Sequence, residues 1–490
     1  MASDVGRASP PVADDKGESS EKPRVEALSI SDSQVADAPA GGYRLYKRRW
    51  VGVFVLFIAE TVASMSWPWF GPIATQVKQD MGYSIDRVDW LGNMIACAYL
   101  VIAFQVPLYV RYFGVRKTTI IGGVFLVISA WIRYAGTARS LSSNGSYALV
   151  ILGQFFAGLA QPIFQILAPK YSELWFDLKT RTTATMIISI ANPIGGAIGQ
   201  LLSPAFPDTR QGILVLGIIS TAAAPLVLLV SDKPPTPPTY AGSKHSPGIH
   251  TLLLAMIGKE THKDAHMTVR ERLDFAIVVW VFAVLLAAIN TFSVLSSDWL
   301  SPYGYSSDTS GFMGAALLLA GIVAALVTAP LFDRVFTSHI ALVIRVLCPT
   351  IGAGWLGLIW AVKKNDDGAL YALFAIIGAC SVALLPIGTF FSFLLGAELT
   401  RNADGSSATL WFFGNLMCII FILAQGALRA PSTANPPLNM HRSIIFNGAW
   451  CFASSFFVFF LHGRQVRRER DVAMQGAEQL SEEAGAQERA

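Results

Sequence analysis

The chain has 490 residues, of which 53% are hydrophobic and only 14% are charged. Soluble globular proteins average about 25% charged residues, so this composition excludes an ordinary soluble protein and indicates many membrane spans. The net charge of +4 is small, which gives no support to a nucleic-acid partner. The five cysteines lie in apolar runs without the spacing of metal ligands, so we expect no metal and no cofactor.

Residues 1–43 are rich in Ser, Ala, Asp, Glu and Pro, a composition that predicts a disordered tail. Twelve apolar runs follow, each of roughly the twenty residues that a helix needs to cross a bilayer. They lie at 50–76, 88–110, 117–137, 147–169, 180–203, 211–231, 273–298, 310–332, 339–362, 369–397, 406–428 and 443–463.

These runs divide into an N-terminal half, 44–231, and a C-terminal half, 273–463, separated by a polar loop at 232–272 and followed by a tail at 464–490. The pattern predicts an all-α integral membrane protein with the major facilitator fold, in which two six-helix halves surround a central cavity.

Lys and Arg residues predict the orientation of the chain. They are concentrated beside residue 44, in the central loop and in the C-terminal tail, and they are sparser in the loops on the opposite side. This excess predicts that both termini and the central loop are cytoplasmic. We expect a monomer in the lipid bilayer, and either the plasma membrane or a vacuolar or lysosomal membrane fits the sequence.

The stretch ASMSWPWFGP (63–72) places two tryptophans and two prolines near the end of the first apolar run. Trp69 and Phe70 are typical of aromatic residues at a membrane interface. Pro68 and Pro72 predict that the helix bends or ends here, leaving backbone groups that neighbours or water must satisfy. In the fifth run, Gly195 and Gly199 form a GxxxG pattern, which predicts close packing against another helix.

Charged residues follow apolar runs at corresponding places in the two halves. In major facilitator proteins, charges in the inner loops form clamps between helices, whereas the alternative is simple solvation of helix ends. We interpret the repeated pattern as a clamp formed by Arg111, Glu173, Asp333, Arg334, Glu398 and Arg401.

Short motifs are spread over residues 48–463. They are RRW (48–50), Trp67, DWL (89–91), SAWIR (129–133), LGQ (152–154), LAQ (159–161), LWF (174–176), ELT (398–400), GSS (405–407) and LAQG (423–426). Together they resemble the FLVCR family of major facilitators, which includes choline and ethanolamine carriers, proposed haem exporters and a lysosomal vitamin B6 exporter. The resemblance implies transport of a small molecule by alternating access.

The resemblance also implies a substrate pocket. Trp67 aligns with a tryptophan that packs against the quaternary ammonium group in the choline carriers, a cation–π contact that is strongest in a dry site. Gln161 and Gln425 align with two glutamines of that pocket, which can bind a hydroxyl group. Phe292 aligns with a family tyrosine, so the ring is kept and the hydroxyl is lost. Ala96 aligns with a methionine, which widens the pocket.

Glu60 lies deep in the first apolar run, where a charged carboxylate is costly. It is seven residues before Trp67, so both side chains would share one face of a continuous helix. A carboxyl group in this place could bind a cationic substrate or exchange a coupling proton. The alternative is a protonated structural acid that is hydrogen-bonded to Asn93 or to the backbone.

These features predict a secondary transporter of a small cationic or amphipathic solute, choline-like or pyridoxine-like. Haem is an alternative substrate, although its iron is usually held by His, Cys, Met or Tyr and no apolar run has a central histidine. A non-transporting membrane receptor is the other alternative, and it would need large structured regions outside the membrane. The sequence has no P-loop and no pairing of a nucleophile with a base, so we expect no enzyme.

Overall fold

The computed structural model describes residues 44–239, 249–259, 267–331, 340–384 and 403–461, all within one compact unit that spans 38–471. These residues form helices and connecting turns, without strands. The helices are α2 (Arg49–Ser64), α3 (Ala74–Met81), α4 (Ile85–Ile102), α5 (Gln105–Ala135), α6 (Ser143–Trp175), α7 (Leu178–Ser189), α8 (Ala191–Leu202), α9 (Thr209–Ala223), α11 (Ile249–Met256), α12 (Val269–Leu300), α13 (Ser307–Leu331), α14 (Ile340–Ala361), α15 (Asp367–Leu384), α17 (Ala403–Ala427) and α18 (His441–Ser455).

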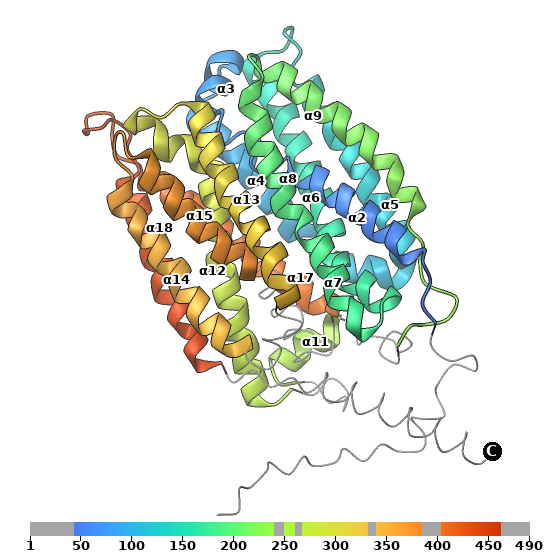
Figure 1. Ribbon diagram of the computed structural model, residues 1–490. Coiled ribbons are helices and arrows are strands. Elements are labelled where there is room, and N and C mark those ends of the chain that lie inside the picture. Colours follow the sequence, from blue (N-terminus) through green and yellow to red (C-terminus); the bar gives the residue numbers. More distant parts are fainter. Residues whose placement is uncertain (1–43, 240–248, 260–266, 332–339, 385–402, 462–490) are drawn as a thin grey trace, which may run out of the picture. The chain divides into compact units, whose positions relative to one another are not determined.

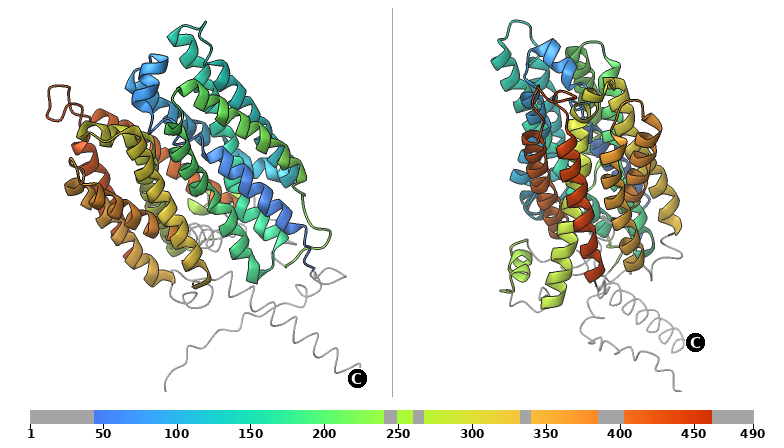
Figure 2. Two further views of the ribbon diagram at one scale, coloured as in Figure 1. Left: turned by 45° about the horizontal axis from the view of Figure 1, so that its top comes forward. Right: turned by 90° about the vertical axis from the view of Figure 1, so that its left-hand side faces the viewer.

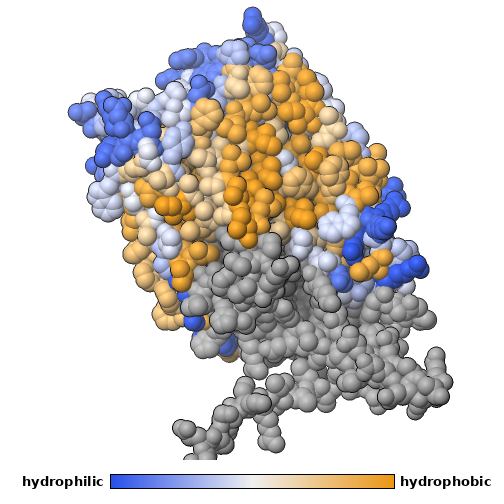
Figure 3. All heavy atoms as spheres, viewed as in Figure 1, coloured by the Kyte–Doolittle hydropathy of each residue, from blue (hydrophilic) through white to orange (hydrophobic). Residues whose placement is uncertain are grey.

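The described residues include nine helical segments that are long and apolar enough to cross a membrane. Large apolar side chains also lie on the outside of the bundle, such as Phe54, Tyr112, Val323 and Trp360. Figure 3 shows hydrophobic residues gathered over the middle of one face of the bundle, with hydrophilic residues toward its ends. A surface of this kind suits contact with lipid, and the prediction of an all-α membrane protein is confirmed.

Two sets of helices pack against each other. The N-terminal helices, α2 to α9, and the C-terminal helices, α12 to α18, lie side by side in Figure 1 and in the left view of Figure 2. Within each set, α5 packs on α6, α13 on α15, and α14 on α18. Across the two sets, α8 contacts α13, and α17 contacts α4 and α6. Side chains from α2, α4, α6, α8, α12, α13 and α17 can therefore meet between the sets.

The first apolar run, predicted as a span over 50–76 with a bend or an end at Pro68 and Pro72, is broken near these prolines. Helix α2 ends at Ser64, turns occupy residues 65–73, and the short helix α3 begins at Ala74. Pro68 and Pro72 account for the break, because proline lacks a backbone N–H and disfavours helical geometry at the preceding residue. Trp67 therefore lies in a turn after the helix, and the helical periodicity that linked it to Glu60 stops before it.

The glycines of α8 allow that helix to contact the backbone of α2. A Cβ atom on Gly195 would lie 2.0 Å from the carbonyl oxygen of Thr61, and one on Gly199 would lie 2.6 Å from that of Met65. Any larger residue would push the helices apart. The close packing predicted from the GxxxG pattern is confirmed, and α2 is the partner.

The polar region predicted at 232–272 contains helix α11. The predicted tails, 1–43 and 464–490, and part of the tenth apolar run lie outside the described residues. The boundaries predicted for the two halves, the central loop and the tails stay predictions.

Candidate functional site

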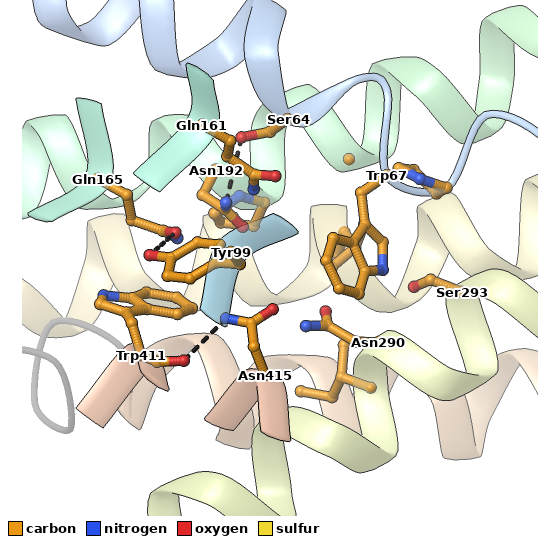
Figure 4. Close-up of a pocket in the computed structure, with 15 residues that line it drawn as sticks. Ser64, Trp67, Tyr99, Gln161, Gln165, Asn192, Asn290, Ser293, Trp411 and Asn415 are labelled. Atoms are coloured by element: carbon orange, nitrogen blue, oxygen red, sulfur yellow. Dashed lines mark hydrogen bonds between the residues drawn. The ribbon is translucent and has the colours of Figure 1, made fainter. Parts of the chain in front are cut away.

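A pocket lies between the N-terminal and C-terminal helices (Figure 4). The empty space between its lining residues amounts to about 440 Å³, a figure that includes open solvent. The lining residues come from seven helices and from the turn after α2. They are Ser64, Trp67, Pro68, Tyr99, Gln161, Gln165, Asn192, Pro193, Gly196, Ile289, Asn290, Ser293, Leu318, Trp411 and Asn415.

The lining combines aromatic rings with neutral amides and hydroxyls. Trp67, Tyr99 and Trp411 supply the rings, and the ring centroids of Tyr99 and Trp411 are 6.2 Å apart. None of the fifteen lining residues carries a formal charge. Figure 4 shows the amide of Asn290 directed toward the ring of Trp67. Such walls can stack on a planar or cationic group and hydrogen-bond polar substituents.

Hydrogen bonds fix part of this lining (Figure 4). The hydroxyl of Tyr99 donates to Gln165 Oε1 at 2.8 Å, which sets the direction of that amide. Asn415 Nδ2 donates to the backbone carbonyl of Trp411 one turn earlier in α17, also at 2.8 Å. Two lining helices, α4 and α6, are joined by the first of these bonds, so the shape of the pocket on that side is preset.

Several buried polar atoms of the lining have no hydrogen-bond partner among the described residues. They include Trp67 Nε1, Gln161 Oε1 and Gln165 Nε2. A buried polar atom without a partner is unfavourable by about 1–3 kcal/mol. A polar solute or water in the pocket would satisfy these two donors and one acceptor, so the wall has hydrogen-bonding capacity left for a ligand.

Glu60 lies directly behind the wall of the pocket and has 1% of its surface exposed. Asn192 Nδ2 donates to Glu60 Oε1 at 2.9 Å, and the Ser64 hydroxyl lies 3.0 Å from the same oxygen. Glu60 Oε2 has no partner among the described residues. The predicted alternative partner, Asn93, is not bonded to Glu60. Asn192 and Ser64 both line the pocket, so they connect this carboxyl group to it.

The structure places Trp67 and Gln161 in the lining of this pocket but Phe292 elsewhere. Residues 289, 290 and 293 of α12 face the pocket, which gives residue 292 a different direction on the helix. The ring of Phe292 is fully buried among aromatic side chains of the C-terminal helices, with its centroid 4.4 Å from that of Phe374 and 5.4 Å from that of Trp299.

Gln425 and Ala96 also lie away from the described lining. Gln425 is ten residues after Asn415 on α17, a distance of about 15 Å along a helix. Its Nε2 donates to Asn447 Oδ1 at 2.9 Å, which joins α17 to α18. Ala96 is fully buried in the core of α4, three residues before Tyr99.

The sequence did not lead us to most of the amide side chains that line the pocket. Asn192, Asn290 and Asn415 stand alone in apolar runs, and polar residues within spans usually face the interior. That signal was present for all three. Alignment to a family pocket gives weight only to positions that the family shares, whereas a search for every polar residue within a span would have found them.

An ion cluster joins the two sets of helices near the end of the bundle where α4 begins and α12 and α17 end. Arg429 Nη2 donates to Asp89 Oδ2 of α4 at 2.8 Å and to Asp298 of α12. Its Nη1 donates to Asp86, which is 82% exposed. Burial alone would lower the pKa of Arg429, but the carboxylates of Asp298 and Asp89 raise that pKa overall. Arg429 therefore stays charged between two buried carboxylates from opposite sets.

The residues of the predicted clamp are only partly described. Asp333, Arg334, Glu398 and Arg401 lie outside the described residues. Arg111 is exposed on α5. Glu173 is buried on α6, with Oε2 3.1 Å from Nζ of Lys170 on the same helix. The clamp stays a prediction. The sequence did not predict the ion cluster around Arg429, because its partners Asp89 and Asp298 lie 340 and 131 residues away along the chain.

Comparisons with known proteins agree with this architecture. The family model of the Major Facilitator Superfamily matches residues 56–422. Solute carrier family 49 member A3 of Danio rerio is 25% identical over 94% of this chain and 97% of its own length. The choline/ethanolamine transporter FLVCR1 of Felis catus is 23% identical over 80% of this chain and 70% of its own length. The resemblance to FLVCR-like carriers is confirmed.

Solved structures share the fold. The D-xylose-proton symporter superposes with a TM-score of 0.64 at 11% identity, covering 85% of this chain and 99% of its own. A bacterial homologue of the human lysosomal transporter Spinster gives 0.59 at 13% identity, covering 87% and 99%. The family and its relatives indicate a transporter rather than an enzyme, with a small-molecule substrate and several membrane spans. The chain belongs to the Major Facilitator Superfamily.

Proposed function

We propose that this protein is a secondary transporter of a small organic cation or amphipathic solute, choline-like or pyridoxine-like, that works by alternating access. The observation that carries the proposal is the pocket between the two sets of helices. Its aromatic rings can hold an ammonium group or a pyridine ring, and its unpaired amide atoms can bind hydroxyl groups.

Glu60 supports a positive charge on the solute. Its carboxyl group is connected to the pocket through Ser64 and Asn192, and it has an unpaired oxygen. When the carboxyl group is ionised, its field favours a cation in the pocket, and when it is protonated that attraction is lost. A proton and a cationic solute would then compete, which offers a route to proton coupling.

The cluster around Arg429 supports alternating access. It joins α4 and α12 through Arg429, which lies just after the end of α17. Rocking of one set of helices against the other would have to break these contacts. The Lys and Arg distribution predicts that this end of the bundle lies on the side opposite the termini. We therefore assign the cluster to the outer gate, which is closed in this structure.

The names of two relatives point to the same chemistry. FLVCR1 of Felis catus and FLVCR2 of Homo sapiens are named choline/ethanolamine transporters.

A thermal-shift screen tests the proposal. Purified protein is heated with choline, ethanolamine, pyridoxine or haemin, and any ligand that raises the unfolding temperature is titrated. We expect stabilisation by choline or pyridoxine and an affinity about tenfold lower in Trp67→Ala, because the aromatic wall is lost. Trp131→Ala is the matched control, since Trp131 is 44% exposed on the outside of α5. Stabilisation by haemin alone, or equal affinity in Trp67→Ala, contradicts the proposal.

A further inference from the structure

The turn that carries Trp67 leaves a backbone carbonyl without a helical partner. Helix α2 stops at Ser64, and Ser66 is fully buried in the turn that follows. Its carbonyl oxygen accepts a hydrogen bond from Nε2 of Gln154 on α6, at 3.3 Å. A buried carbonyl in a membrane protein needs such a donor. The bond fixes the residue directly before Trp67 to the neighbouring helix.

Both polar atoms of the Gln154 side-chain amide form hydrogen bonds. The same Nε2 donates to the carbonyl oxygen of Leu91 on α4, at 3.2 Å, and Oε1 accepts from Arg133 Nη1 at 2.5 Å. Because an arginine has donors and no acceptors, the oxygen of the amide must face Arg133 and its nitrogen must face the two carbonyls. Arg133 therefore determines which way the amide points.

Arg133 is an unusual residue for this place. It is fully buried in the last turn of α5, and its Nε and Nη2 have no partner among the described residues. A buried charge without a carboxylate is costly, and the helix C-terminus offsets only part of that cost. Close packing of α5 on α6 keeps Arg133 in this buried place, because a Cβ atom on Gly153 would lie only 2.7 Å from Arg133 Cβ. A neutral side chain would fill the same space more favourably, so the charge calls for a role beyond packing.

We propose that Arg133 and Gln154 form a positioning pair that holds Trp67 in the substrate pocket and so determines the preference for a cationic solute. The charged hydrogen bond locks the amide, and the locked amide holds the Ser66 carbonyl beside Trp67. Neither residue is in the pocket lining. The selectivity part of this inference rests on the proposed function, whereas the positioning part does not.

Gln154→Glu separates positioning from folding. A carboxylate at residue 154 still accepts from Arg133 and neutralises its charge, which offsets the cost of leaving the Ser66 and Leu91 carbonyls without a donor, so the protein should still fold. It cannot donate to Ser66 or Leu91, so the turn loses its anchor. Gln76→Glu is the matched control, because Gln76 Nε2 also donates to a backbone carbonyl, that of Phe206 at 3.0 Å, outside the pocket lining.

Two measurements follow on the full-length protein. Fluorine NMR of protein labelled with 5-fluorotryptophan reports the position of Trp67, whose line among the twelve tryptophans is identified with Trp67→Phe. The second measurement compares the affinities for choline and for its uncharged carbon analogue, 3,3-dimethylbutan-1-ol. We expect Gln154→Glu to shift or broaden the Trp67 line and to lower the preference for choline about fivefold to tenfold, with no change in Gln76→Glu.

The outcomes distinguish the two proposals. An unchanged Trp67 line in Gln154→Glu overturns the positioning pair. A changed line with equal losses of affinity for both ligands overturns its role in selectivity. A changed line in a protein whose wild type binds neither choline nor pyridoxine supports positioning and contradicts the proposed substrate class. If Gln154→Glu does not fold, Arg133→Leu replaces it, because a neutral residue frees the amide to turn; a Trp67 line unchanged in that variant overturns the pair equally.

Discussion

The pocket and the Arg429 cluster are both buried polar regions between the N-terminal and C-terminal helices, but the pocket lining is uncharged and the cluster consists of charged side chains. The pocket has neutral amides and rings, with unpaired atoms at Trp67, Gln161 and Gln165. In the ion cluster, Arg429 instead satisfies two buried carboxylates directly. A neutral wall with spare hydrogen-bonding capacity suits a changing occupant, whereas a self-contained charge cluster suits a contact between protein parts. On our proposal, this difference separates residues that bind substrate from residues that control conformation.

Arg429→Ala should give the largest effect, because it leaves Asp89 and Asp298 buried without their cation. Removing one partner of such a cluster costs about 3–5 kcal/mol, so the unfolding temperature should fall and uptake should drop at least tenfold. Uptake in proteoliposomes and thermal unfolding measure the two effects. A pocket cysteine, Asn290→Cys, should also react faster with an impermeant thiol reagent added from the outer side.

The control for this change is Lys363→Ala. Lys363 and Asp366 form an ion pair of 3.0 Å, with side chains 65% and 29% exposed, within the C-terminal helices. Exposed pairs contribute at most about 1 kcal/mol, so its loss should leave uptake and labelling near wild type. Equal labelling in Arg429→Ala and the wild type would falsify the assignment of the cluster to a gate.

Phe292→Ala should damage stability while sparing the pocket. The ring is buried against Phe374, Trp299 and Trp355, so truncation should lower the free energy of unfolding by about 3–5 kcal/mol. Affinity of the folded fraction for the screened ligand should stay within about twofold of wild type, because the ring is outside the described lining. A tenfold loss of affinity without loss of stability would indicate that Phe292 belongs to the binding site.

Glu60→Gln tests the coupling role of the carboxyl group. An ionised Glu60 attracts a cation, so wild-type affinity for choline should rise with pH, whereas the glutamine variant should lose most of that dependence over the pH range in which the protein stays folded. Equilibrium binding across this range measures the change. Glu271→Gln is the control, because Glu271 caps α12 through Thr268 at a distance from the pocket. A pH profile that survives in Glu60→Gln assigns the carboxyl group to structure alone.

The sequence predicted those parts of the molecule that depend on local pattern. Apolar runs predicted the membrane helices, GxxxG predicted the packing of α8, and Pro68 and Pro72 predicted a break in the first run. It did not predict that this break would remove Trp67 from the helical face of Glu60, since a turn's geometry depends on tertiary partners such as Gln154. The Asn192 contact to Glu60 crosses 132 residues, and spacing along the chain carries no signal for such pairs.

Tyr99→Phe should give the smallest effect, and it tests whether the preset hydrogen bond in the pocket matters. The hydroxyl donates to Gln165 Oε1 at 2.8 Å, and its loss frees the amide of Gln165 to turn, at a cost of about 0.5–1.5 kcal/mol. Affinity for the screened ligand should therefore fall about threefold to tenfold, with little change in unfolding temperature. Tyr109→Phe removes the same kind of bond, from Tyr109 to Gln105 Oε1 at 2.8 Å, outside the pocket lining. If both variants lose affinity equally, the loss comes from general loosening of the helices; if only Tyr99→Phe does, the neutral amide wall is a preorganised binding surface.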